Sequence, residues 1–135
     1  MDAKSPEFRK ALAEMYKYMA EKLSLKEVPR VLLVDDKKNS ELLLGGTGSY
    51  DNQNKIIRAN ITGRHPKDIL RTIAHEILHH AQNERGDLQS ATDESAQDPQ
   101  YAQNDPHLRK MEIEAYAKGN LLFRDWSDSK KYGQK

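Results

Sequence analysis

Apolar residues recur at intervals of three and four between positions 69 and 81, and this spacing predicts a helix buried along one side. Pro66 fits the first helical turn, where its missing N–H needs no partner, and Asp68 is favourable near the positive end of the helix dipole. The chain therefore contains an amphipathic helix that begins near Pro66. Its predicted buried positions are Ile69, Leu70, Ile73, Ala74, Ile77, Leu78 and Ala81.

Two further segments have helical spacing. The first is predicted to span about Pro6–Leu23, because Ser5 is a good N-cap and the proline after it fits the first helical position. The second is predicted to span about Pro106–Trp126. Gly119 interrupts this helix at a cost of about 1 kcal/mol relative to alanine. A residue this small would allow a close approach to the helix that begins near Pro66.

Three short apolar runs predict strands, at Val31–Val34, Glu41–Leu44 and Lys55–Ile61. The glycine-rich segment Gly45–Gly48 is expected to be a loop at a sheet edge, and Tyr50–Asn54 is rich in turn-forming residues. Together with the three helices, these runs predict an α+β fold. In it, a small mixed three-stranded sheet packs on an N-terminal, a central and a C-terminal helix.

The length of 135 residues predicts one domain spanning residues 1–135. Residues 83–106 are polar and turn-prone, so they are expected to form a loop, either a lid over a site or a solvated linker. Residues 127–135 are expected to be a flexible tail. The formal net charge of +1 indicates neither a nucleic-acid partner nor a membrane surface.

The chain has no cysteine, which excludes disulfides, thiolate metal ligands and a cysteine nucleophile. The sequence shows no signal peptide and no apolar run of about 20 residues. A monomeric cytoplasmic protein is therefore the expectation.

The central predicted helix carries the motif His75-Glu76-x-x-His79. Residues four apart lie one above the other on a helix face, so the imidazoles of His75 and His79 can converge on one ion. Zinc suits neutral imidazole nitrogens, and a catalytic zinc keeps one position for water. Glu76 follows the first histidine and is placed to take a proton from that water.

Such a site needs a third protein ligand. A third histidine six residues after His79 is absent, because Arg85 occupies that position. The C-terminal helix offers Glu112 and Glu114, which lie about 200° apart around a helix and cannot both face one ion. His107 is a rival ligand, and periodicity alone leaves these alternatives open.

This combination, His75-Glu76-x-x-His79 with a downstream Glu112-Ile113-Glu114-Ala115, resembles the gluzincin-type zinc metallopeptidases. The likeness is to compact single-domain members, including small phage zincin-like peptidases and the ImmA/IrrE type, and spans about residues 55–123. It implies a zincin-like fold with one Zn²⁺ per chain. It further implies Glu114 as the third ligand, Glu112 as a supporting or rim carboxylate, and a phage-encoded protein acting in its host cell. Tyr116 departs from the family pattern, which has asparagine there.

Three other side chains are candidates around the site. His80 lies one turn after Glu76 and could orient it, His107 could act as an electrophile at the cleft, and Tyr116 could donate to an oxyanion.

The predicted activity is peptide-bond hydrolysis by zinc-activated water, with Glu76 as the general base. The peptide is expected to lie extended along a sheet edge, with Lys55–Ile61 as the edge strand. The alternative is a non-catalytic binding module that the same metal stabilises.

Overall fold

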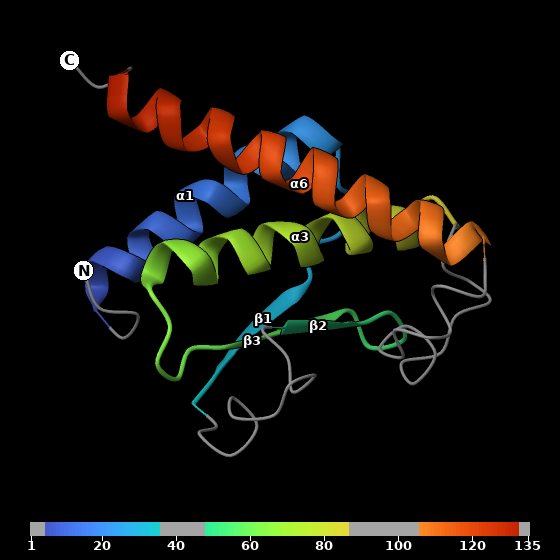
Figure 1. The fold of residues 1–135 in the computed structure, drawn as a ribbon, viewed down its shortest axis with the longest axis horizontal. Helices are drawn as coiled ribbons and strands as arrows, with labels where there is room; N and C mark the ends of the chain where they lie inside the picture. Colours follow the sequence, from blue (N-terminus) through green and yellow to red (C-terminus); the bar gives the residue numbers. More distant parts are fainter. Residues whose placement is uncertain (1–4, 36–47, 87–105, 133–135) are drawn as a thin grey trace.

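A computed structural model of the chain describes residues 5–35, 48–86 and 106–132. Helix α3 lies between the sheet on one side and helix α6 on the other, and α1 packs against both helices (Figure 1). This arrangement confirms the predicted α+β class with a mixed three-stranded sheet. The elements are α1 Pro6–Leu23, β1 Arg30–Val34, β2 Gly48–Asp51, β3 Ile56–Asn60, α3 Pro66–Glu84 and α6 Pro106–Tyr132.

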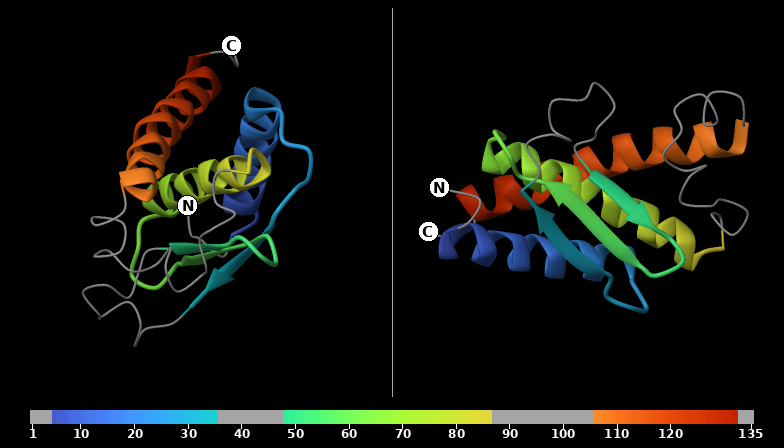
Figure 2. Two further views of the ribbon diagram at one scale, coloured as in Figure 1. Left: turned by 90° about the vertical axis from the view of Figure 1, so that its right-hand side faces the viewer. Right: turned by 90° about the horizontal axis from the view of Figure 1, so that it is seen from below.

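The strand order is β1-β3-β2, with β1 parallel and β2 antiparallel to β3 (Figure 2). The predicted strand Lys55–Ile61 therefore forms as β3, shorter by one residue at each end. It is the central strand, so both of its backbone edges are already paired. The expectation that a peptide lies along Lys55–Ile61 is wrong, because an added strand needs unpaired N–H and C=O groups.

Strand β2 forms in a segment where the sequence predicted loop and turn. Tyr50 and Asp51 are buried in the pairing with β3, and the turn that follows begins at Asn52. The predicted strand Glu41–Leu44 lies outside the described residues. The edge strand that packs against α3 is β2.

Helix α1 has the predicted bounds. The Ser5 side chain accepts a hydrogen bond from the Phe8 N–H at 3.2 Å, as expected for an N-cap. At the other end, Ser24 adopts a left-handed conformation (φ 52°), and its N–H closes the last turn. The side chains that α1 buries are Phe8, Ala11, Met15 and Met19.

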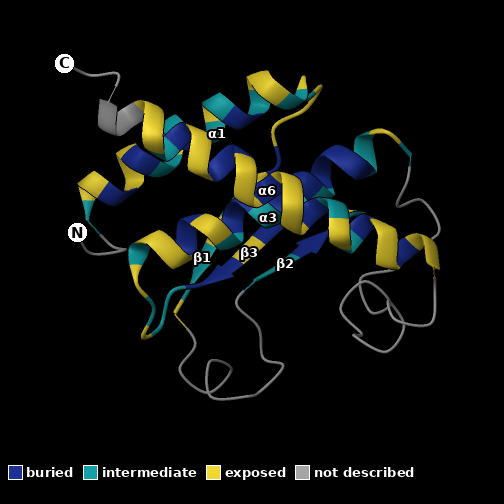
Figure 3. Cartoon of the chain, turned by 45° about the horizontal axis from the view of Figure 1, so that its top comes forward, coloured by how far each residue is buried: buried dark blue, intermediate teal, exposed yellow. Residues whose placement is uncertain are grey.

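Helix α3 buries all seven apolar positions predicted for it, from Ile69 to Ala81, and lies in the interior of the fold (Figure 3). It begins where the sequence predicts, with the His65 side chain accepting a hydrogen bond from the Lys67 N–H at 3.1 Å. Glu76, His80 and Gln82 are also buried, which the apolar pattern did not predict.

Helix α6 begins at Pro106 as predicted but continues to Tyr132. Residues 127–132 are therefore helical, contrary to the expectation of a flexible tail from residue 127. A Cβ added at Gly119 would lie 3.3 Å from the His75 Cα, so the glycine does allow the close approach of α6 to α3. None of the helices in the described ranges combines the length and apolar character needed to cross a membrane.

The end of α3 is tied to the segment after α1 by Glu84. Its carboxylate accepts hydrogen bonds from the N–H groups of Lys26 and Glu27 at 2.9 and 2.8 Å. Burial alone would raise the pKa of Glu84, but these two N–H groups and His80 outweigh it and lower the pKa. This carboxylate therefore stabilises the fold in its charged form.

We expect Glu84→Gln to lower the free energy of unfolding by about 1–2 kcal/mol at pH 7, because an amide oxygen accepts less strongly than a carboxylate. The parent's higher free energy of unfolding is fully present above about pH 4.3, the pKa of a glutamate in the unfolded chain. It is lost as the pH falls through the lower pKa that Glu84 has in the folded protein. Urea denaturation at pH 7 and at pH 3 measures both effects. A difference between the two proteins that grows on acidification would contradict this role.

Candidate metal site

Three potential metal ligands meet where α3 packs on α6. His75 and His79 come from α3 and Glu112 from α6, and one ligand atom of each lies within 4.8 Å of the others. Nε2 of His79 is 2.6 Å from Glu112 Oε1, and Nε2 of His75 is 3.6 Å from Glu112 Oε2. The two imidazole rings are 4.8 Å apart between centroids. The motif histidines therefore converge as their spacing predicted.

This group has the dimensions of a metal site. Ligand atoms around a tetrahedral zinc are about 3.3 Å apart, given zinc–ligand distances of about 2.0–2.1 Å. The observed 2.6 and 3.6 Å bracket that value. Two imidazole nitrogens and one carboxylate are also a donor set that zinc accepts. Within the described ranges this is the one group found that could hold a metal ion, and it offers three protein ligands.

The acid beside the histidines is Glu112, whereas the family resemblance implied Glu114 as the third ligand. Glu114 Oε1 lies 2.7 Å from Nη2 of Arg85 and accepts a hydrogen bond from Gln82 at 2.8 Å. These partners hold the carboxylate away from the two imidazoles and lower its pKa, Arg85 having the largest effect. Glu112, expected as a supporting or rim carboxylate, is the acid that lies with the two histidines in the group that could hold a metal ion.

Gln82 orients His79, and no sequence signal pointed to it. Its side chain is fully buried, and its Nε2 donates to the Met111 carbonyl at 2.9 Å and to Glu114. Since both of these partners are acceptors, Oε1 of Gln82 faces His79 and accepts from its Nδ1 at 2.9 Å. Nδ1 therefore carries hydrogen, which directs Nε2 of His79 toward the site.

His75 has a different environment. Its ring packs on the ring of Tyr116, with centroids 4.3 Å apart, and its Nδ1 is buried with no hydrogen-bond partner in the part of the chain described. Tyr116 is 61% exposed, so it covers His75 from the solvent side. The structure thus places Tyr116 next to His75, one of the two histidines of the metal group.

Glu76 lies between the metal group and the sheet. It is 6% exposed, and a Cβ added at Gly48 of β2 would be 3.7 Å from its Cγ. Burial raises the pKa of Glu76, the two histidines oppose this shift, and Glu112 adds to it. The carboxyl group thus adjoins the ligands without being one of them.

When no metal is bound, the acids and histidines of the group shift one another's pKa values. Burial alone would lower the pKa of His79, but the hydrogen bond to Glu112 and the charges of Glu76 and Glu112 raise it to about 9. Burial alone would raise the pKa of Glu112, but its hydrogen bonds to both histidines lower it well below its ordinary value. His79 and Glu112 therefore form an ion pair when no metal is bound.

His80 does not orient Glu76, contrary to the expectation. Its Nε2 faces the carbonyl of Glu27 at 2.8 Å and the carboxylate of Glu84 at 3.2 Å, so this nitrogen carries hydrogen. Its Nδ1 then accepts from the Tyr50 hydroxyl at 2.7 Å. His80 is fully buried and links α3 to β2 and to the segment after α1.

His107 is exposed at the start of α6 and is not a member of the metal group. The expectation of a lid within residues 83–106 concerns a segment that lies mostly outside the described residues. Glu112, the acid in the metal group, was one of the alternatives that the sequence left open. The buried, supporting Gln82 was not among them.

We expect Gln82→Leu to weaken the binding of a metal ion at this site, with zinc as the probe, by about 10–100-fold, because His79 would lose the acceptor that fixes its ring and tautomer. Competition with a chromophoric zinc chelator measures the affinity. Gln53→Leu, at an exposed position in the turn between β2 and β3, is the matched control and should bind zinc as the parent does. Equal affinities for Gln82→Leu and the parent would show that Gln82 does not support the ligand.

No protein-family model, curated protein or solved structure matches the chain. The function is therefore inferred from the residues of the site and their geometry.

Proposed function

We propose that the protein is a zinc-dependent metallopeptidase with a zincin-like fold. The observation that carries this proposal is the meeting of His75, His79 and Glu112 beside the buried carboxyl group of Glu76. Three protein ligands are typical of catalytic zinc sites, which leave a further position for water, whereas structural sites have four. The described residues offer three, which favours hydrolysis over the alternative of a non-catalytic binding module.

Each site residue has a definite task in such a reaction. His75, His79 and Glu112 would hold the ion, and zinc, when bound, would supply Lewis-acid activation of water and of the scissile carbonyl. Glu76 takes the proton from the attacking water and later delivers it to the leaving amine. Gln82 keeps the His79 ring in the orientation that ligation needs.

The position of β2 supports a peptide as the substrate. Among the described strands β2 pairs with β3 alone, so its other edge is available for a further strand. Gly48 lies close to both Thr72 and Glu76 of α3, since an added Cβ would be 2.6 Å from the Thr72 Cγ2. An extended peptide paired with the free edge of β2 would pass beside Glu76 and present its carbonyl groups to the metal group.

Metal removal tests the proposal. Protein purified without added zinc is expected to contain about one zinc per chain and to cleave a mixture of peptides of known sequence. A chelator should abolish cleavage, and added zinc should restore it. Mass spectrometry of the products and elemental analysis of the protein give the two readouts. Stoichiometric zinc without cleavage would favour the binding module, and protein that binds no zinc would exclude both functions.

A further inference from the structure

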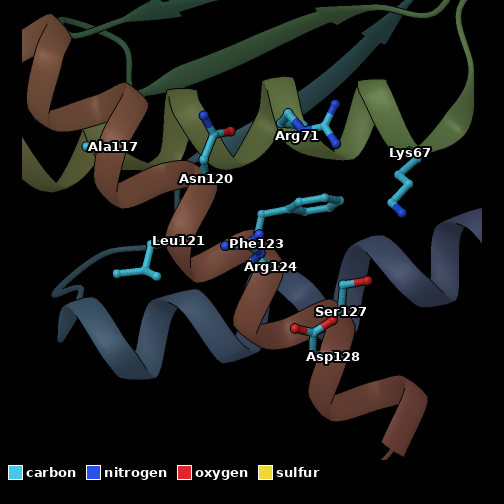
Figure 4. A pocket seen from close by; sticks show the side chains of 9 residues that line it. All are labelled: Lys67, Arg71, Ala117, Asn120, Leu121, Phe123, Arg124, Ser127 and Asp128. Carbon is cyan, nitrogen blue, oxygen red and sulfur yellow. The ribbon is translucent and has the colours of Figure 1, made fainter.

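A second feature lies along the junction of α3 and α6. It is a hollow of about 530 Å³ between the first half of α3 and the second half of α6 (Figure 4). Its lining residues are Lys67, Arg71, Ala117, Asn120, Leu121, Phe123, Arg124, Ser127 and Asp128. In the figure, Lys67 extends from α3 toward α6, and Phe123 and Ser127 extend from α6 into the space between them.

The hollow is predominantly cationic. Lys67, Arg71 and Arg124 supply three positive charges, and Asp128 supplies the one negative charge of the lining. Arg71 is held in place by Asp68, whose carboxylate is 2.9 Å from Nη1, and by the Phe123 ring, whose centroid is 5.3 Å from the guanidinium carbon. Among the ion pairs of the described residues, none involves Lys67 or Arg124. Two cations therefore remain available beside a guanidinium that is already oriented.

The hollow and the metal group both lie along the junction of α3 and α6. On α3, Arg71 precedes His75 by one turn. On α6, Asn120 follows Tyr116 by one turn, and the Tyr116 ring covers His75. One turn of helix advances about 5.4 Å, and an extended peptide advances about 3.3 Å per residue. A substrate residue one to three positions from a scissile bond held at the metal group would therefore be level with Arg71 along α3.

We propose that this hollow is a specificity subsite for an acidic side chain of the peptide substrate. A planar guanidinium binds a carboxylate through two parallel hydrogen bonds, and Arg124 has no ion-pair partner among the described residues to compete for them. Arg71, whose Nη1 already donates to Asp68, adds positive charge and its remaining N–H donors. Asn120 and Ser127 add neutral donors at the same place. A nucleic-acid phosphate backbone fits less well, because the chain has a net charge of only +1. The assignment rests on the proposed peptidase function.

A binding experiment tests the subsite without requiring turnover. The probe is a pool of capped hexapeptides with glutamate at one fixed position and alanine, serine or leucine elsewhere, and a matched pool carries glutamine at the fixed position. The protein is zinc-loaded Glu76→Gln, and NMR follows the Nε–H signals of Arg71 and Arg124. The glutamate pool is expected to shift both signals and to bind about tenfold more tightly than the glutamine pool.

Charge-removing variants locate the effect. Arg71→Gln and Arg124→Gln should each remove most of the preference for glutamate. Arg30→Gln, which removes one exposed charge from β1, should keep it. Equal binding of the two pools would overturn the subsite, as would displacement of the glutamate pool by a short oligothymidylate at comparable concentration.

Cleavage of the two pools by the parent protein distinguishes failure of the acidic subsite from failure of the proposed peptidase function. If the parent cleaves both pools at equal rates, the peptidase function stands and the acidic subsite is wrong. If the parent cleaves neither pool while the glutamate pool still shifts Arg71 and Arg124, the hollow binds carboxylates and the peptidase function is what fails.

Discussion

Replacing Glu76 by glutamine is expected to lower the rate of peptide hydrolysis by about 10²–10⁴-fold, the range that a general base contributes. Glutamine has nearly the shape of glutamate but cannot accept the proton of the attacking water. Zinc content should stay near one per chain, because His75, His79 and Glu112 are unchanged. Turnover of a fluorogenic peptide together with elemental analysis measures both quantities.

The stability of this variant is an internal control. Glu76 is buried at the contact of α3 with Gly48, and a neutral amide there should be tolerated at least as well as a buried charge. Glu76→Gln should therefore unfold at the same urea concentration as the parent or at a higher one. Unchanged hydrolysis by a zinc-loaded Glu76→Gln protein would mean that another group is the base.

Replacing Glu112 by alanine is expected to weaken zinc binding by about 10²–10³-fold, roughly one ligand's share of the free energy with which proteins bind this ion. Glu112 contacts both histidines, so its loss also removes the acid that holds His79 in the metal-free protein. Zinc affinity measured by competition with a chelator gives the result, and hydrolysis should fall with zinc occupancy.

Glu114→Ala is the matched comparison, because it removes the same carboxylate two positions along the same helix. Glu114 acts on the site only through Gln82, so its loss should weaken zinc binding by less than about tenfold. The reverse order of the two effects would mean that Glu114 leaves Arg85 and becomes the ligand when zinc binds. The pair of variants therefore decides which acid completes the site.

The buried positions of α6, which the structure shows, distinguish the two glutamates that periodicity in the sequence left open. At 100° per residue, Glu112 lies about 60° from the centre of the buried stripe and Glu114 about 100° from it on the opposite side. The family resemblance favoured Glu114, and the burial pattern favours Glu112. The stripe is centred on Leu108, Met111, Ala115, Gly119, Leu122 and Trp126, and the buried Phe123 lies on the side of it that Glu112 occupies.

Supporting contacts around the ligands could not be predicted in this way. Gln82 and Glu114 are 32 positions apart, and Tyr50 and His80 are 30 apart. No periodicity within one element connects such pairs, because they depend on how the elements pack. His80 seemed a natural partner for Glu76 one turn away, yet its ring turns toward Tyr50 and the segment after α1.

The sequence by itself determined the elements whose causes are local. The cap and proline at the start of α1, the seven buried positions of α3, and the placing of His75 and His79 on one face all depend on residues within a few turns. Only the tertiary structure decided the order of the strands, the identity of β2 as the edge beside Glu76, and the meeting of Glu112 with His75 and His79. The physical reason is that strand pairing and helix packing join residues far apart in the chain, and no local pattern encodes which of them meet.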